Sequence, residues 1–202
     1  MGIGALKGLL PAVFLDRDGV INEDVFYPET GEWEAPLRPE DLVLRPGVLP
    51  ALQRLAESGF VLVLVSNQAA HAKGKVPLEA LMAVDARLRA LLAEAGIGFA
   101  EFCYSYSHPD GVVPGFSGPS LERKPSPYFL LVAAARHGLD LAASWMVGDR
   151  DTDIRCGQAA GTRTILVANP HAGANVGVAS PDYRCEGLPE AAEIIAESSR
   201  SA

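Results

Sequence analysis

The chain has 202 residues, a formal net charge of −8 and a composition that is 49% hydrophobic. This length suits one domain with a substantial buried core, and the hydrophobic content excludes an intrinsically disordered chain. The acidic charge repels the phosphate backbone of DNA and RNA, so no general nucleic-acid binding is expected.

Cysteine usage and hydropathy narrow the class further. Cys103, Cys156 and Cys185 are widely spaced and form no CxxC pair, which indicates reduced thiols in a cytoplasmic protein. No apolar run approaches the roughly 20 residues of a membrane-spanning helix, so no membrane partner is expected. The N-terminal residues are interpreted as a short tail before the first strand, not as a signal peptide.

Short apolar segments alternate with helical patterns along the chain. The predicted strands are Ala12–Leu15, Phe60–Val65, Phe99–Tyr104, Ser144–Val147 and Thr164–Ala168. The predicted helices are Leu49–Ser58, Leu78–Ala95, Pro127–His137 and Thr152–Ala160. Each of these helices is followed by a glycine suited to a left-handed cap. The alternation predicts an α/β fold of three layers, Rossmann-like, with a mainly parallel sheet between helices.

Residues 1–202 are predicted to form a single domain, with a core of about 10–170 and a C-terminal helix of about 188–199. Two long irregular stretches, Asn22–Gly47 and Ser105–Pro125, leave from the carboxyl ends of predicted strands. Ligands of open α/β sheets bind beyond those ends, so both stretches are expected to border the site. No insert of domain size follows the first or second strand, which predicts an open site without a cap.

Polar side chains follow four of the predicted strands. They are Asp16 and Asp18 after the first, Ser66 and Asn67 after the second, Arg123 and Lys124 in the loop beyond the third, and Asp149, Arg150, Asp151 and Asp153 after the fourth. In a parallel sheet all four groups meet at one edge. Crowded carboxylates repel one another, and a hard cation such as Mg²⁺ removes that repulsion. The helix N-terminus after Ser66 and the ammonium of Lys124 can then hold a phosphate.

Two aspartates separated by one residue can divide a phosphoryl-transfer reaction between them. One attacks phosphorus and forms an aspartyl-phosphate. The other protonates the leaving oxygen and later activates water. Simpler interpretations stay open from the residues alone: turn formation for Asp16 and Asp18, helix capping for Ser66 and Asn67, and a solvated Lys124.

The segments FLDRDGVIN, VSNQ, RKPSP and MVGDRDTD resemble the four ordered motifs of the haloacid dehalogenase (HAD) superfamily of phosphohydrolases. The resemblance runs from about residue 12 to residue 168. DRDGVIN and RKPSP are similar to the subclass that contains D-glycero-D-manno-heptose 1,7-bisphosphate phosphatase and the histidinol-phosphatase domain. The resemblance implies a Mg²⁺-dependent phosphomonoesterase of carbohydrate metabolism. Heptose 1,7-bisphosphate is the first expected substrate, and histidinol phosphate or another sugar phosphate is the alternative.

The same resemblance implies a role for each matching residue. It makes Asp16 the nucleophile, Asp18 the general acid/base, and Asp16, Asp18 and Asp149 the metal ligands. Ser66, Asn67 and Lys124 are implied to hold the phosphoryl group, and Arg123 and Arg150 to contact the substrate. Asp153 is implied to orient Lys124 or the metal-bound water. The family's strand order places the first predicted strand centrally, beside the fourth.

One departure concerns a zinc-binding loop that the subclass commonly carries. The positions of its ligands here read Ser105, Ser107, Ser120 and Glu122. Only His108 remains nearby, and a structural zinc needs three or four good ligands, so no zinc is expected. The loop is then ordered by packing of Tyr104, Tyr106 and Phe116, or it is mobile.

Two other classes of function stay open. A phosphoacceptor signalling module also gathers Asp, Ser and Lys around Mg²⁺, but the third predicted strand ends in CYSYSHP, without the acceptor aspartate. A non-catalytic module that binds a phosphorylated ligand would not need both Asp16 and Asp18. The expected partner is a small phosphorylated metabolite, and the chain is expected to be a monomer or a small homo-oligomer.

Overall fold

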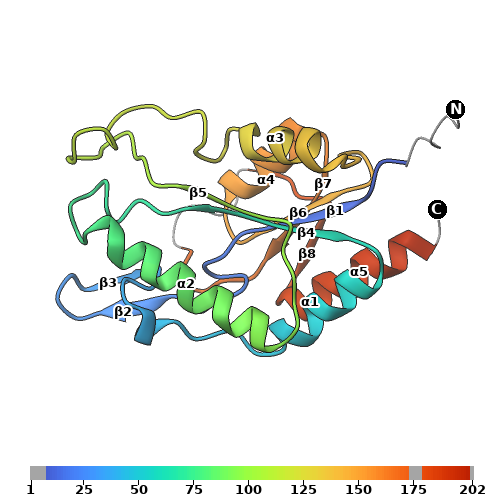
Figure 1. The fold of residues 1–202 in the computed structure, drawn as a ribbon, viewed down its shortest axis with the longest axis horizontal. Coiled ribbons are helices and arrows are strands. Elements are labelled where there is room, and N and C mark those ends of the chain that lie inside the picture. The colour runs from blue at the N-terminus through green and yellow to red at the C-terminus, as the bar shows by residue number, and fades with distance from the viewer. Residues whose placement is uncertain (1–7, 173–178, 201–202) are drawn as a thin grey trace, which may run out of the picture.

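The computed structural model describes residues 8–172 and 179–200, which form three layers around a six-stranded sheet (Figure 1). The strands follow the order β5-β4-β1-β6-β7-β8, and every neighbouring pair is parallel. Their bounds are β1 Ala12–Leu15, β4 Val61–Asn67, β5 Glu101–Ser105, β6 Trp145–Gly148, β7 Arg163–Val167 and β8 Tyr183–Cys185. The first strand therefore lies centrally, between β4 and β6, as the resemblance implies.

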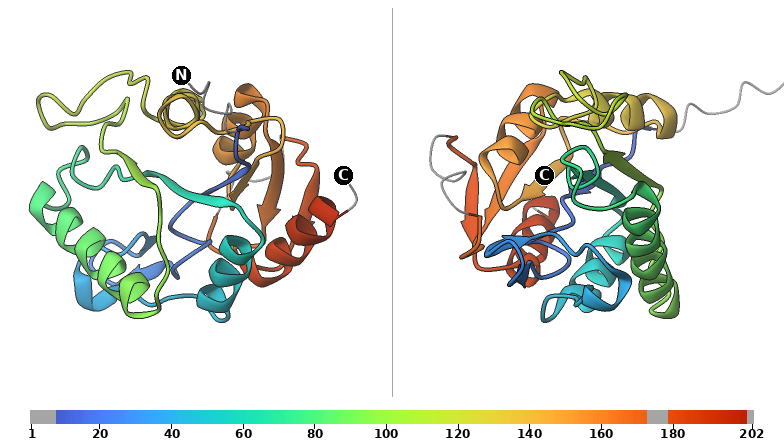
Figure 2. Two further views of the ribbon diagram at one scale, coloured as in Figure 1. Left: turned by 45° about the vertical axis from the view of Figure 1, so that its right-hand side comes forward. Right: turned by 90° about the vertical axis from the view of Figure 1, so that its left-hand side faces the viewer.

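Helices cover both faces of the sheet (Figures 1 and 2). On one face lie α3 (Tyr128–His137) and α4 (Asp151–Ala160), and on the other lie α1 (Val48–Glu57), α2 (Leu78–Glu94) and α5 (Leu188–Arg200). The buried strand β1 alternates between the two cores because successive side chains point to opposite faces. Ala12 and Phe14 belong to the core beneath α3 and α4, whereas Val13 and Leu15 belong to the other. Burial on both faces fixes the position of β1, whose last residue directly precedes Asp16.

The predicted elements are confirmed, with ends that differ by at most two residues from the expected ones. Each of the four predicted cap glycines has a positive φ. Three elements escape the sequence pattern: the antiparallel hairpin β2 (Val25–Tyr27) and β3 (Glu32–Glu34), the 3₁₀ turn η1 (Pro39–Asp41), and β8. The strands among them have only three residues each, too short for a readable period.

Residues 16–47 between β1 and α1 hold the hairpin and η1 and no larger insertion, as expected for a site without a cap domain. Within residues 8–172 and 179–200, no helix combines the length and the apolar character needed to cross a membrane. The polar segments at the carboxyl ends of β1, β4 and β6 thus meet at an edge that only loops and the hairpin surround.

Adjacent leucines on α3 offer a test of the layered packing. Leu130 is fully buried against the sheet, whereas Leu131 is 47% exposed. Leu130→Ala is expected to lower the free energy of unfolding by about 2–5 kcal/mol, because it leaves a cavity in the core. Leu131→Ala, the matched control, is expected to cost less than about 1 kcal/mol. Urea unfolding followed by circular dichroism measures both, and equal losses would contradict the orientation of α3.

Candidate active site

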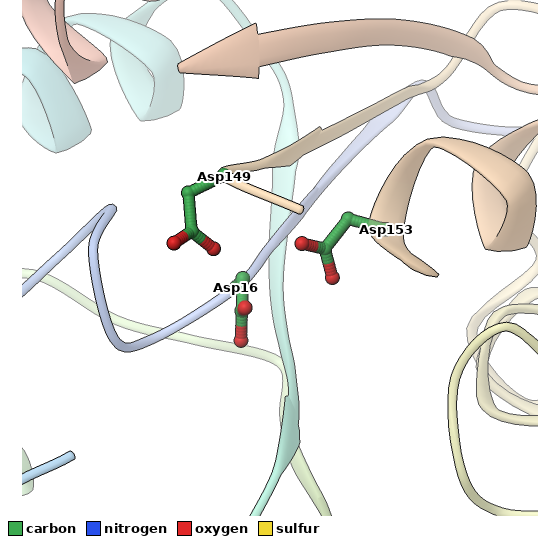
Figure 3. Close-up of side chains that lie close together, drawn as sticks. All are labelled: Asp16, Asp149 and Asp153. Atoms are coloured by element: carbon green, nitrogen blue, oxygen red, sulfur yellow. The ribbon is translucent and has the colours of Figure 1, made fainter. Parts of the chain in front are cut away.

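A cavity of about 370 Å³ opens at the carboxyl edge of the sheet. Of the predicted site residues, its lining includes Asp16, Asp18, Ser66, Asn67, Arg123, Lys124 and Arg150. Asp149 lies just beneath, buried, with a carboxylate oxygen within 4.8 Å of those of Asp16 and Asp153 (Figure 3). The structure therefore brings every predicted site residue to one place. A larger cavity of about 870 Å³, beside β7 and β8, contains none of them.

Lys124 is the cation at the centre of the carboxylates. Its Nζ lies 2.9 Å from Asp16 Oδ1 and 2.6 Å from Asp153 Oδ1, and it donates a 2.7 Å hydrogen bond to the Val65 carbonyl. Burial lowers the pKa of Lys124, but the charges of Asp153 and Asp16 outweigh it and raise that pKa, so the side chain stays an ammonium. Its contact with Asp153 is the first of the two roles expected for that residue.

Asp16 keeps one carboxylate oxygen available. Oδ1 accepts the backbone N–H of Arg17 at 2.7 Å as well as the Lys124 ammonium. Neither of these two contacts involves Oδ2. An oxygen of this kind, on a side chain anchored through its other oxygen, can act as a nucleophile or as a metal ligand.

Asp149 lies in a buried and acidic environment that raises its pKa. Burial first, and then the nearby charges of Asp16 and Asp153, raise its pKa from 3.8 to about 8. Asn169 Nδ2 donates to Asp149 Oδ2 at 2.7 Å and to Asp24 Oδ2 at 2.8 Å. Asp149 Oδ1 is buried without a hydrogen-bond partner among the described residues. Three crowded carboxylates against one ammonium, with one oxygen unsatisfied, fit a hard divalent cation.

Gly19 packs directly against the hydrogen-bonded side chains of Asn169 and Asp149. Its φ is +76°, and a Cβ at this position would lie 2.4 Å from Asn169 Nδ2 and 2.6 Å from Asp149 Oδ2. Only glycine combines this backbone conformation with such a close approach. The glycine that follows the paired aspartates thus leaves room for the amide that orients Asp149.

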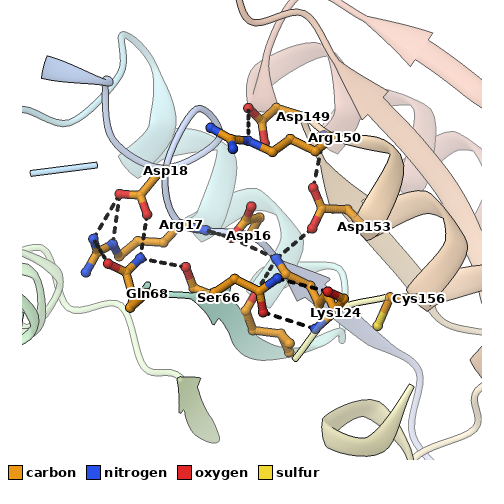
Figure 4. A network of polar contacts seen from close by, with 12 residues as sticks. Asp16, Arg17, Asp18, Ser66, Gln68, Lys124, Asp149, Arg150, Asp153 and Cys156 are labelled. Carbon is orange, nitrogen blue, oxygen red and sulfur yellow. Dashed lines mark hydrogen bonds and ion pairs between the residues drawn. The ribbon is translucent and has the colours of Figure 1, made fainter. Parts of the chain in front are cut away.

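Asp18 lies in a different environment from Asp16, although only one residue separates them (Figure 4). Its Oδ1 accepts hydrogen bonds from Arg17 Nε and Asn22 Nδ2, both at 3.0 Å, and its Oδ2 accepts one from Gln68 Nε2 at 2.5 Å. Burial alone would raise the pKa of Asp18, but the Arg17 charge and these hydrogen bonds lower it below its usual value. The two carboxylates therefore have different partners. Asp16 contacts the Lys124 ammonium, whereas Asp18 contacts the Arg17 guanidinium and two side-chain amides.

The two residues that follow β4 face the cavity in different ways. Ser66 Oγ accepts a 2.9 Å hydrogen bond from Gln68 Nε2. Asn67 is tied to the backbone of Lys124: its Oδ1 accepts the N–H at 3.0 Å and its Nδ2 donates to the carbonyl at 3.1 Å. The structure thus gives Asn67 a bracing contact that the sequence does not reveal, and its contact with a phosphoryl group stays a prediction.

Cations gather on the outer wall of the cavity, where Lys73, Arg123 and Arg150 line it together with His108. Arg123 Nη1 donates to the Ser107 carbonyl at 3.2 Å, and Arg150 Nε lies 3.6 Å from Asp149 Oδ2. Burial and the charges of Arg123 and Lys73 lower the pKa of His108, so this ring is neutral near pH 7. This wall offers positive charge about the mouth of an acidic pocket.

The hairpin β2–β3 forms another part of the cavity wall, through Glu32, Trp33 and Glu34. The Trp33 ring stacks on His171 with centroids 3.6 Å apart and planes at 10°. Lys75 Nζ lies 2.8 Å from both Glu32 Oε2 and Glu34 Oε1. The hairpin is therefore joined to the segment after β7 through one ring and to the segment after β4 through one ammonium.

The polar residues closest to the predicted carboxylates that the sequence did not predict are Arg17, Asn22, Gln68 and Asn169. Arg17 and Gln68 stand inside the recognised motifs, but a charged or amide side chain is ordinarily assigned to the surface. Asn169 directly follows β7, so the rule applied to the other strand ends could have found it. Asn22 is the last residue of the motif FLDRDGVIN and the first of a stretch interpreted as irregular, so it was assigned no role.

Comparisons with known proteins agree with this geometry. A family model described as HAD-hydrolase-like matches residues 121–191. The D-glycero-D-manno-heptose-1,7-bisphosphate 7-phosphatase of Thermosynechococcus vestitus is 39% identical over 194 residues, which are 92% of this chain and 95% of that protein. The D-glycero-beta-D-manno-heptose-1,7-bisphosphate 7-phosphatase of Escherichia coli is 34% identical over 159 residues, covering 78% of this chain and 79% of that protein.

Solved structures are similar over nearly the whole chain. A HAD-like phosphatase from Mesorhizobium loti has a TM-score of 0.77 and 31% identity, and covers 98% of this chain and 91% of its own. The D,D-heptose 1,7-bisphosphate phosphatase from B. bronchiseptica, complexed with magnesium and phosphate, has a TM-score of 0.74 and 28% identity. That match covers 94% of this chain and 99% of the other.

The raised pKa of Asp149 predicts how the metal-free protein depends on pH. The folded chain holds this proton more tightly than the unfolded chain, so stability is lost as the pH rises from about 4 to about 8. Asp149→Asn removes the buried charge. In EDTA at pH 8 it is expected to be more stable than the wild type by more than about 1 kcal/mol.

This advantage should shrink toward pH 5, and Mg²⁺ should stabilise the wild type but not the variant. Thermal unfolding across pH 5–8 measures both effects. Asp110→Asn, at a side chain that is 91% exposed, is the control. A difference between Asp149→Asn and the wild type that does not change with pH would contradict the assigned environment.

Proposed function

The chain belongs to the HAD-like phosphatase family of its heptose-bisphosphatase relatives, and we propose that it hydrolyses a heptose 1,7-bisphosphate. It is a phosphoric monoester hydrolase with the α/β fold of that family. The observation that carries the proposal is the pairing of a buried carboxylate cluster around Lys124 with a cationic wall, in a chain 39% identical over 92% of its length to one such phosphatase.

The first half of the reaction forms a covalent intermediate on Asp16. Its Oδ2 attacks phosphorus while the bond from phosphorus to the sugar oxygen breaks. The protonated form of Asp18, which its lowered pKa makes the minor form near pH 7, gives its proton to that oxygen, so the sugar leaves as an alcohol. Lys124 and the Ser66 hydroxyl hold the non-bridging oxygens, and Asn67 keeps the Lys124 backbone in place.

The second half returns Asp16 to its starting state. Asp18, now a carboxylate, takes a proton from water, whose oxygen attacks phosphorus as the bond from phosphorus to Asp16 breaks. The products are inorganic phosphate and a free Asp16. The hydrogen bonds that Asp18 accepts from Arg17, Asn22 and Gln68 suit the ionised form that this step requires.

We assign a Mg²⁺ site to the side chains of Asp16 and Asp149 and the backbone carbonyl of Asp18. The unsatisfied Asp149 Oδ1 and the crowding of three carboxylates within 4.8 Å support this assignment. When bound, the ion supplies positive charge that offsets the carboxylates and the phosphoryl group. The magnesium and phosphate in the B. bronchiseptica relative point the same way.

The cationic wall favours a substrate with a second phosphate. Within the described residues, Arg123 forms no ion pair with a carboxylate, and its guanidinium contacts the neutral carbonyl of Ser107. Burial and the Arg150 charge lower the pKa of Arg123, because two neighbouring positive charges repel each other. A bound anion would offset this repulsion. Histidinol phosphate carries an amine at the corresponding end, which this wall would repel.

Zinc binding, cellular location and oligomeric state are three further properties of the chain. We propose that the loop 105–125 binds no zinc, because hydrogen bonds and rings hold it: Val112 N–H donates to the Ala72 carbonyl at 2.7 Å, and Phe116 packs edge-on against His71. The three cysteines are free and buried, which supports a reducing, cytoplasmic location. The oligomeric state, monomer or small homo-oligomer, stays a prediction.

The proposed activity is tested by phosphate release from sugar mono- and bisphosphates and from histidinol phosphate. Release is expected to require Mg²⁺, to be fastest with heptose 1,7-bisphosphate, and to fall at least about 10³-fold in Asp16→Asn, which lacks the nucleophile. Asp182→Asn, on the far edge of the sheet, is the control. Comparable activity on histidinol phosphate and none on heptose bisphosphate would overturn the substrate, and no Mg²⁺-dependent release at all would overturn the function.

The cationic wall is tested separately with Arg123→Ala. Losing a charge-assisted hydrogen bond to the second phosphate costs about 1.5–3 kcal/mol. The KM for the bisphosphate is therefore expected to rise at least about tenfold more than the KM for p-nitrophenyl phosphate. Steady-state kinetics measure both, with Arg54→Ala on α1 as the matched control. Equal changes for the two substrates would mean that Arg123 does not contact the second phosphate.

A further inference from the structure

The Gln68 side chain connects Ser66 with Arg17 and Asp18 (Figure 4). Its Oε1 accepts from Arg17 Nη2 at 2.8 Å, while its Nε2 donates to Asp18 Oδ2 at 2.5 Å and to Ser66 Oγ at 2.9 Å. The amide has one workable orientation, because the reverse would set its oxygen against a carboxylate and its nitrogen against a guanidinium. All of its hydrogen bonds are therefore directional.

The partners of Gln68 are themselves held firmly. Arg17 is fully buried, contacts Asp18 Oδ1 through Nε and Nη2 at 3.0 Å, and lies 5.8 Å from the centre of the Tyr104 ring. The Tyr104 hydroxyl donates to Asp85 Oδ1 at 2.7 Å, which ties the group to α2. The Gln68 backbone N–H donates to the Ser105 carbonyl at 2.7 Å. The amide is thus supported from β4, β5 and β1 together.

We propose that Gln68 is a positioning residue that sets the Asp18 carboxyl and the Ser66 hydroxyl at a fixed separation, so that the proton donor faces the leaving oxygen of a phosphate held by Ser66. The proposal rests on the proposed phosphatase function. By donating to Ser66 Oγ, Gln68 occupies a lone pair of that oxygen and leaves its proton free for a phosphoryl oxygen. By donating to Asp18 Oδ2, it fixes the plane of the carboxyl group.

The effect of Gln68 on Asp18 can be distinguished from its effect on Ser66 by comparing substrates with different leaving groups. An alkoxide needs the proton of Asp18 to depart, whereas p-nitrophenolate is stable enough to leave without it. Holding the phosphoryl group through Ser66 matters equally for both substrates. Because kcat/KM covers only the steps up to formation of the aspartyl-phosphate, its dependence on the leaving group reports the acid role of Asp18 alone.

The experiment compares kcat/KM for glycerol 1-phosphate and p-nitrophenyl phosphate in the full-length protein with Mg²⁺. In Gln68→Met, which keeps the size and removes the hydrogen bonds, the ratio of alkyl to aryl kcat/KM is expected to fall at least about tenfold. In Ser66→Ala, the matched control, both values are expected to fall by the same factor. Gln68→Glu, whose carboxylate cannot donate the hydrogen bond that fixes Asp18, is expected to lower the ratio as well.

Each outcome decides a separate point. A ratio equal to that of the wild type in Gln68→Met and Gln68→Glu, with melting temperatures close to the wild type, would overturn the proposal. An equal fall on both substrates would also overturn it, since that is the behaviour of a residue acting only through Ser66 or through the fold. Failure of the wild type to release phosphate from these two substrates and from heptose 1,7-bisphosphate would instead overturn the proposed function.

Discussion

The buried ion pairs of Lys124 with Asp16 and Asp153 are the interaction on which the site depends. They join three elements far apart in the sequence: the end of β1, the loop before α3 and the start of α4. Lys124 and Arg150, whose Nε lies 3.6 Å from Asp149 Oδ2, do not balance three carboxylates, so the pocket keeps an excess of negative charge that raises the pKa of Asp149. The fold therefore carries an excess of negative charge that a divalent cation can offset.

The same edge of the sheet gives neighbouring aspartates opposite surroundings. Asp16 shares a cation with other carboxylates, whereas Asp18 has its own arginine and two amide donors. Separate environments are the usual physical basis for assigning different roles to two carboxyl groups in one site. Here the difference arises because the buried side chains of Arg17 and Gln68 both contact the carboxylate of Asp18. The proposed nucleophile and the proposed proton carrier thus differ in partners before any substrate binds.

The sequence predicts this fold well where a segment is long or buried on both faces. The run Ala12–Leu15 reads as a central strand because all of its residues are apolar, and parallel topology then places the aspartates that follow. The hairpin β2–β3 escapes prediction because Phe26 and Trp33 are exposed, so no alternation marks its strands. Gln68 escapes as a site residue for another reason: its partners Arg17 and Asp18 lie about 50 positions away, and only the folded chain brings them together.

The cationic wall explains how an acidic chain can accept an anionic substrate. A net charge of −8 repels phosphate over most of the surface, but the charges near the cavity are arranged locally. Lys75 pairs with Glu32 and Glu34 on the hairpin, Lys124 pairs with Asp16 and Asp153, and Arg150 faces Asp149 at 3.6 Å. The cavity lining also holds the positive charges of Lys73 and Arg123. The core of the sheet therefore determines the reaction, while the loops around it determine which phosphate ester reaches Asp16.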